Sequence, residues 1–212
     1  MNEIIGTLRL TGRCATHMAS CPRAPWTWRV ANLVRYRLWD WPRLAVAHVA
    51  ARLGTPVLIG RLFLRLHKAD GSWIDYGLVS TRLVTTAFVT LMVDNLQAET
   101  SAWGDFKFHG IGTGTTAAAV GDTLLETELT TEYATDNTRP TGSQTETSAT
   151  VYRSVGTITI DSGTPAITEH GLFNAAASGA VTLMDRHVFS AVNMVGGDSL
   201  VATYELTCAA GG

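Results

Sequence analysis

The chain of 212 residues has few charged side chains and few cysteines, and both shortages narrow what the protein can be. Charged residues make up 16% of it, against about 25% in an average soluble domain. Such a surface is typical of a protein that hides part of itself against partners. The three cysteines include no C-x-x-C pair, so neither a zinc site nor a disulfide framework is expected. We therefore expect no metal, no cofactor and ordinary reduced cysteines.

Long hydrophobic runs are also lacking. The most apolar run, residues 56–66, is interrupted by Arg61 and Arg65, and a membrane-spanning helix needs about 20 apolar residues. Residues 1–20 show neither the apolar core nor the cleavage site of a secretory signal. These absences predict a protein made in the cytosol that does not enter a membrane.

The charges that are present are unevenly distributed. Residues 1–68 hold eleven basic and two acidic residues, a net charge of +9, whereas residues 69–212 hold five basic and sixteen acidic residues, a net charge of −11. The second part is also rich in Thr and Gly, which favour strands and turns. We predict two units: a basic, Trp-rich, helical arm over residues 1–55 and a β domain over residues 56–212. Such asymmetry indicates an arm that binds something acidic.

The arm is predicted to form two short helices. Helical spacing runs from Trp28 to about Asp40, Pro42 should interrupt it, and residues 44–53 read as a second helix ended by Gly54. The apolar residues spread too far round these helices for a clean surface stripe, so the helices should lie on another surface. Trp and Arg dominate protein interfaces, so a protein partner is favoured over nucleic acid and over a membrane surface. The residues predicted to make the anchoring contacts are Arg29, Arg35, Arg37, Trp39 and Trp41.

The remainder is predicted to be mainly β. A strand over residues 57–67 should turn at Asp70-Gly71 into a second strand, and an amphipathic helix should follow, capped by Ser80 or Thr81 and reaching about Leu96. Residues 136–147 are polar and are predicted to be a long exposed loop. Further strands are predicted at residues 106–111, 124–133, 149–160, 166–173, 182–192 and 199–208. Seven or eight strands suggest a β-sandwich, jelly-roll-like, with one amphipathic helix.

Two motifs resemble a phosphate-binding loop and a catalytic carboxylate pair, but neither has the full pattern of a functional site. The stretch G-I-G-T-G-T-T, residues 110–116, lacks the Lys that a phosphate loop needs, and is read as a turn that requires unusual backbone angles. Glu126 and Glu128 would share one face of a strand and could flank a sugar, but a solvated strand face is the commoner reason for such a pair.

A hydrolytic triad is the remaining catalytic alternative. Asp185 and His187 would share a strand face and could orient a base for Ser190 or Ser199. No G-x-S-x-G elbow accompanies them, and no H-E-x-x-H motif occurs among the six histidines. We therefore expect no catalytic residues and no enzymatic activity.

Long motifs follow one another in a fixed order over residues 57–212. They are W-I-D-Y-G-L-V-S-T-R-L-V-T-T (73–86), W-G-D-F-K-F-H-G-I-G-T-G-T-T (103–116), V-G-D-T-L-L-E-T-E (120–128), T-R-P-T-G (138–142), I-T-E-H-G-L-F (167–173), L-M-D-R-H-V-F-S-A-V-N (183–193) and G-D-S-L-V-A-T-Y-E-L-T (197–207). This set resembles a family of virion structural proteins of tailed bacteriophages, and within it the capsid decoration, or cement, proteins. The resemblance implies the major capsid protein as partner, a homo-oligomer, commonly a trimer, and a place on the capsid surface after assembly in the host cytoplasm.

The leading hypothesis is thus a capsid cement protein whose arm holds it to the shell. A tail or fibre component that contacts the host, with residues 136–147 as receptor contacts, is the first alternative. A virion-associated hydrolase and a nucleic-acid binder are weaker ones.

Overall fold

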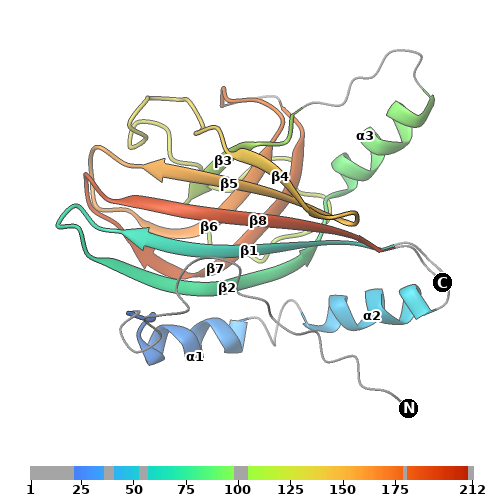
Figure 1. Cartoon of the computed structure of the whole chain (residues 1–212), viewed down its shortest axis with the longest axis horizontal. Helices are drawn as coiled ribbons and strands as arrows, with labels where there is room; N and C mark the ends of the chain where they lie inside the picture. The colour runs from blue at the N-terminus through green and yellow to red at the C-terminus, as the bar shows by residue number, and fades with distance from the viewer. Residues whose placement is uncertain (1–21, 36–40, 53–56, 98–104, 179–180, 210–212) are drawn as a thin grey trace.

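The protein is mainly β, with two antiparallel sheets and three helices in the part that the structure describes (Figure 1). The computed structural model describes residues 22–35, 41–52, 57–97, 105–178 and 181–209. The elements in chain order are α1 (Trp26–Arg35), α2 (Trp41–Arg52), β1 (Val57–His67), β2 (Trp73–Leu83), α3 (Thr86–Gln97), β3 (Phe108–Gly112), β4 (Ser143–Ser148), β5 (Val151–Thr159), β6 (Ala166–Phe173), β7 (Leu183–Asn193) and β8 (Ser199–Ala209). None of the described helices is long and apolar enough to cross a membrane.

The two sheets differ in size. Sheet A has the strand order β2-β1-β8-β5-β4, and sheet B has the order β3-β6-β7. In Figure 1, sheet A faces the viewer and sheet B lies behind it. β1 pairs with β8 along its whole length, from Val57 opposite Ala209 to His67 opposite Ser199. The two ends of the predicted β domain therefore form the centre of sheet A.

The main hydrophobic core takes side chains from both sheets. Leu62 and Leu200 from sheet A are fully buried in one cluster with Ile167 and Phe189 from sheet B. On β1, Leu62, Leu64 and Leu66 are buried while the interposed arginines are exposed, as expected for a strand with one wet face. Burying each such side chain stabilises the fold by about 1.5–3 kcal/mol.

Most predicted strands are confirmed, including the alternating one, now β8. The predicted helix start is wrong. Ser80 and Thr81 belong to β2, which continues to Leu83, and α3 is instead capped by Thr85, whose Oγ1 accepts the N–H of Phe88 at 3.2 Å. β2 contacts β7 and α2, and its residues 79–82 are buried, so tertiary contacts extend a strand that its own residues did not mark.

Two further predictions are corrected between β3 and β5. Residues 124–133 do not form a strand and make only isolated bridges, such as Gly112 with Glu128. Their backbone N–H groups at Glu126 and Thr127 donate to the Glu169 side chain on sheet B instead of to a neighbouring strand. Residues 136–147 are not simply an exposed loop, since β4 begins at Ser143. Arg139, in the same stretch, is fully buried: its guanidinium stacks 3.6 Å from the Phe173 ring centroid and its Nη2 donates to Glu128 Oε2 at 2.7 Å.

The described part of the predicted arm lies against the β domain. The backbone N–H of Ala24 donates to the carbonyl of Asp75 on β2 at 3.0 Å, and the indole Nε1 of Trp28 donates to the carbonyls of Ser190 and Ala191 on β7, each at 2.9 Å. α1 therefore lies beside β2 and β7. The predicted division at residue 55 stays a prediction.

Candidate functional site

α1 turns its apolar side to solvent. Trp26 is 74% exposed, and Val30, Leu33 and Val34 are exposed as well. These four residues, which we call the α1 stripe, follow the spacing i, i+4, i+7 and i+8, so they share one side of the helix. A surface helix of a globular protein ordinarily buries its apolar side. The reversed orientation indicates a surface kept for a partner.

A buried asparagine holds α1 in this orientation. Asn32, on the opposite side of the helix from the stripe, is only 8% exposed. Its Nδ2 donates to the carbonyl of Val79 on β2 at 2.8 Å, and its Oδ1 accepts the N–H of Ser190 on β7 at 3.0 Å. Trp28, beside it, packs edge-on against Tyr76 with ring centroids 4.7 Å apart. The polar side of α1 therefore faces the sheets, where Asn32 and Trp28 make specific hydrogen bonds to β2 and β7.

A groove of about 560 Å³ runs between α1 and β2. Trp28 and Asn32 line it from the helix, and Tyr76 and Ser80 line it from the strand. The Oγ atom of Ser80 is buried and has no hydrogen-bond partner among the described residues. Arg29 stands exposed at the rim. The groove and the α1 stripe together form the candidate site, a concave, partly polar surface beside a convex apolar one.

The predicted anchoring residues fall in different places. Arg29 is exposed next to the α1 stripe, whereas Arg35 ends α1 and is half-buried. Arg37 and Trp39 lie outside the described residues, and Trp41 begins α2 with its side chain outside them too. Of the two whose side chains are described, Arg29 and Arg35, the structure brings Arg29 to the candidate site. The α1 stripe was missed, although its spacing was visible, because sequence alone does not show which side of a helix meets solvent.

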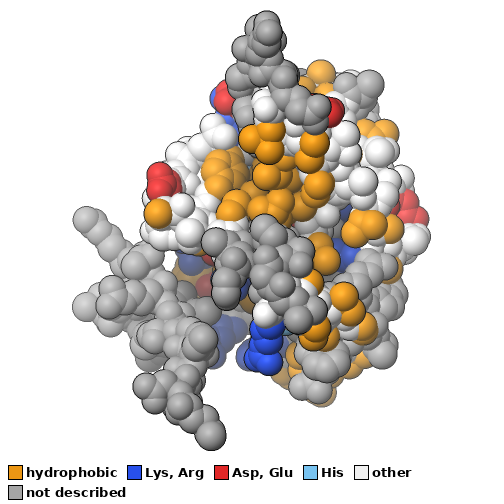
Figure 2. Space-filling view, turned by 90° about the vertical axis from the view of Figure 1, so that its right-hand side faces the viewer, with side chains coloured by type: hydrophobic (Ala, Val, Ile, Leu, Met, Phe, Trp, Pro, Cys, Tyr) orange, Lys and Arg blue, Asp and Glu red, His pale blue; other side chains and the backbone are white. Residues whose placement is uncertain are grey.

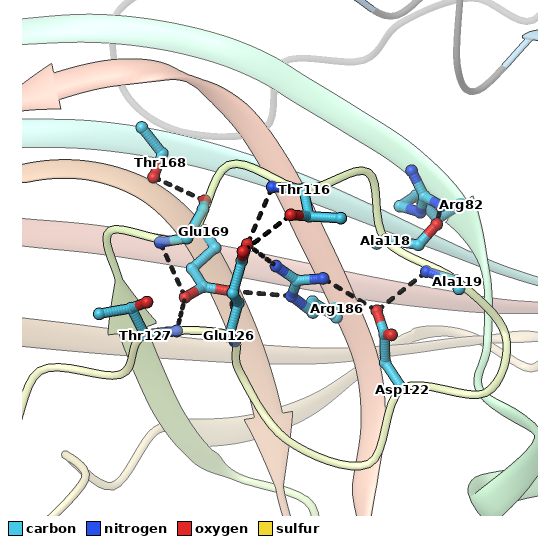
Figure 3. Close-up of polar contacts among 11 residues, drawn as sticks. Arg82, Thr116, Ala118, Ala119, Asp122, Glu126, Thr127, Thr168, Glu169 and Arg186 are labelled. Carbon is cyan, nitrogen blue, oxygen red and sulfur yellow. Dashed lines mark hydrogen bonds and ion pairs between the residues drawn. The ribbon is translucent and has the colours of Figure 1, made fainter.

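The glycine-rich stretch belongs to a buried ion-pair cluster rather than to a turn. The carboxylate of Glu169 on β6 accepts the backbone N–H of Gly114 at 3.0 Å, that of Thr127 at 2.7 Å and that of Glu126 at 3.0 Å (Figure 3). A Cβ at Gly112 would lie 2.6 Å from Glu169 Oε1. The expectation of unusual backbone angles is therefore wrong: positive φ among the described glycines occurs at Gly71, Gly77, Gly163 and Gly197. These glycines are small so that a carboxylate can approach.

Arg186 completes this cluster. From β7 its guanidinium contacts Glu169 at 2.8 Å, Asp122 at 3.0 Å and Glu126 at 3.2 Å (Figure 3). Hydrogen bonds from Thr116, and then the charge of Arg186, hold the pKa of Glu126 below its usual value. Because the carboxylates of Asp122, Glu126 and Glu169 all bind Arg186, the cluster holds residues 113–128 on sheet B.

The acidic pair proposed as a sugar site points to two different arginines. Glu126 binds Arg186, whereas Glu128 binds Arg139. The two carboxylates therefore pair with different guanidinium groups, an arrangement that suits a structural role better than the shared water or sugar of a glycosidase.

The Asp185–His187 pair forms, but the triad does not. His187 Nε2 lies 3.2 Å from Asp185 Oδ2, and both side chains are buried. The hydroxyl of Ser199 instead contacts Thr159 Oγ1 at 2.8 Å, and Ser190 contacts α1 through its backbone. The described residues include no group of three His, Cys, Asp or Glu side chains that could hold a metal ion.

His187 belongs to a buried row of three histidines in sheet B. His109 Nδ1 lies 2.9 Å from His170 Nε2, and His109 Nε2 lies 2.9 Å from the hydroxyl of Ser154 on β5. Burial lowers the pKa of His109 to about 3 and that of His170 well below its usual value. Both imidazoles are therefore neutral at neutral pH, and His109 joins the two sheets through its hydrogen bond with Ser154 rather than through a charge.

Comparison with known proteins adds no relative. No family model matches the chain, no curated protein is significantly similar to it, and no solved structure matches it. The functional conclusion therefore depends on the chain's own residues.

Proposed function

We propose that this protein is a non-catalytic virion structural protein of a tailed phage, most specifically a capsid decoration protein that binds the major capsid protein. The observation that carries the proposal is the α1 stripe, an apolar surface turned outward on a helix that is fixed from below by Asn32. A function in assembly explains why the apolar side chains of the α1 stripe are exposed to solvent, because a partner would cover them.

The chemistry of the α1 stripe suits a protein partner with acidic groups around an apolar centre. Trp26 supplies a large aromatic anchor, and Arg29 and Arg23 are exposed beside it. Trp and Arg are the residues that most often dominate binding energy at protein interfaces. The basic part of the chain, residues 1–68 with a net charge of +9, is thus the part that meets the shell.

The finer features of the fold belong to the same proposal. Sheets A and B share one core, and we take them to form a single β-sandwich that projects outward from the capsid. The jelly-roll-like connection, the separate arm and the trimer stay predictions.

The test compares two matched variants on capsids of the phage whose genome encodes the chain. Val30→Ser combined with Leu33→Ser should lower the number of copies that sediment with decoration-free capsids, because both lie in the α1 stripe. Val195→Ser, at 46% exposure against 48% for Val30, should bind as the wild type does. Equal loss or equal binding of the two would contradict the role of α1.

A cryo-EM reconstruction of the intact particle decides the location. A regular array of density over the head is the expected result. Density confined to the tail would replace the decoration function with host contact.

A further inference from the structure

The groove between α1 and β2 has a buried polar atom without a partner. Ser80 is 2% exposed and lines the groove, and its Oγ atom makes no hydrogen bond within the part of the chain that the structure describes. Buried hydroxyls are ordinarily hydrogen-bonded, because an unpaired one has lost water without gaining a replacement. A ligand that reaches the floor of the groove would supply the missing partner.

The rim of the groove carries positive charge that no described residue neutralises. Arg23 and Arg29 line it, both are exposed, and neither makes an ion pair with a described residue. The acidic residue of the lining, Asp75, is already engaged: its Oδ1 accepts the N–H of Gly77 at 2.8 Å, and its Oδ2 lies 3.8 Å from Arg65 Nη2. The two guanidinium groups are therefore free to bind carboxylates, which their planar N–H groups suit well.

This charge distinguishes the groove from a second apolar surface. α2 and α3 lie on the right-hand side of Figure 1, and Figure 2, which views that side, shows hydrophobic side chains gathered on it. Val89, Val93 and Leu96 of α3 are exposed there, but α3 has no Lys or Arg. That surface does not indicate the chemistry of an occupant, whereas the groove does.

The groove has the dimensions of an extended peptide. Its lining on the strand side runs from Asp75 to Thr81, a length of about 20 Å at about 3.3 Å per residue. Its volume of about 560 Å³ lies within the range of ligand-binding clefts. The chain's own residues 22–24 already lie beside the start of this strand, where Arg23 forms a parallel bridge with Asp75, so the edge of sheet A accepts a slender segment.

We propose that the groove binds an extended acidic peptide segment of the partner protein. Asp or Glu side chains of the segment pair with Arg23 and Arg29 at the rim, an apolar side chain beside them covers Leu78, and a peptide carbonyl accepts the hydroxyl of Ser80. The inference rests on the proposed function for the source of the segment, the capsid protein. It adds a contact that the α1 stripe does not make, because only a slender segment reaches a buried floor.

The first test measures peptide binding in solution, without capsids. The full chain is mixed with a positional-scanning library of short fluorescein-labelled peptides, and fluorescence anisotropy reports which residues it selects. The expected result is selection of Asp or Glu beside Leu or Val. No selection, or selection of Lys and Arg, overturns the proposal. Tighter binding of oligothymidylate than of any peptide also overturns it, in favour of nucleic acid.

Two pairs of variants then locate the peptide. Leu78→Trp fills the groove from an exposed position and should raise the dissociation constant of the selected peptide about tenfold or more. Val195→Trp, at 46% exposure against 47% for Leu78 and outside the groove, should leave it unchanged. Arg29→Glu should weaken binding, whereas Arg52→Glu, exposed at the end of α2, should not. Equal binding within either pair contradicts the groove as the site.

Ser80→Ala distinguishes a ligand contact from a structural one. Because the hydroxyl has no partner within the described fold, its removal should leave the melting temperature at the wild-type value or above it. The dissociation constant of the peptide should rise about tenfold, as one hydrogen bond to the ligand is lost. Unchanged peptide binding, or a lower melting temperature, overturns the function of Ser80 in the site.

Sedimentation with capsids separates this inference from the proposed function. If Leu78→Trp loses the peptide and still decorates capsids as the wild type does, the groove is not the capsid contact and this inference alone fails. If the wild type selects an acidic peptide but ignores capsids, the proposed function alone fails.

Discussion

The guanidinium Nε of Arg186 lies 2.8 Å from the Oε2 atom of Glu169 on the neighbouring strand, and both side chains are buried. Glu169 also accepts three backbone N–H groups from residues 114–127. One ion pair thus fixes a long irregular segment on sheet B. Removing one partner of such a pair leaves an uncompensated charge in the interior.

Arg186→Met should therefore lower the free energy of unfolding by about 3–5 kcal/mol. Arg153→Met is the matched control, since Arg153 pairs with Glu205 on a strand face that is partly exposed and such pairs contribute about 1 kcal/mol or less. Urea unfolding followed by circular dichroism measures both. Equal losses would mean that the cluster does not hold the segment.

Stability should fall in mild acid because of the histidine row. His109 and His170 are neutral when folded, so unfolding lets each take up a proton once the pH drops below about 6.5. The unfolded state then binds more protons, and stability decreases by about 1.4 kcal/mol per pH unit for each imidazole. For His109 this loss of stability extends from pH 6.5 down to about pH 3.

The measurement is the free energy of unfolding between pH 7.5 and pH 5, above the range in which most carboxylates titrate. Replacing both residues by Gln should flatten the slope, whereas His67→Gln, at an exposed strand end, should leave it as it is. A wild-type slope near zero would show that these imidazoles are not kept neutral by burial.

Gly112→Ala should destabilise the protein by about 1–3 kcal/mol or more, because overpacked cores must shift to make room. The new Cβ would lie 2.2 Å from the carbonyl oxygen of Thr127, which is backbone and cannot rotate away. Gly121→Ala is the control, since nothing lies within 4 Å of a Cβ there. Melting temperatures of the two variants give the comparison, and a melting temperature of Gly112→Ala equal to that of the wild type would contradict the close approach.

Asn32→Ala should loosen α1 without unfolding the sheets. It removes the buried hydrogen bond to β2 and the partly buried one to β7, and an unsatisfied buried group left behind costs about 1–3 kcal/mol. Hydrogen exchange within residues 26–35 should become faster while exchange in β8 stays slow. Leu33→Ala, one residue further along and exposed, should change neither. Slow exchange in α1 of the Asn32 variant would show that other contacts hold the helix.

Local pattern was enough to predict the mainly β class and most strands. β8 alternates apolar and polar residues over its whole length, and β1 and β2 flank an Asp-Gly turn, so their periodicity and turn chemistry agree. The same local pattern wrongly predicted a strand over residues 124–133. They have the β-branched composition of a strand, but Glu126 is bound by Arg186, which is 60 residues away in the sequence, and Glu128 is bound by Arg139.

The sequence by itself determined where the chain alternates, where it turns and how its charge divides, because these depend on neighbours a few residues apart. Only the tertiary structure decided which side of α1 faces out, why Gly112 has no side chain and which arginine holds which carboxylate. Those features depend on contacts such as Asn32 with Ser190, which are 158 residues apart. No local propensity encodes such a contact, since its free energy exists only once both sheets are in place.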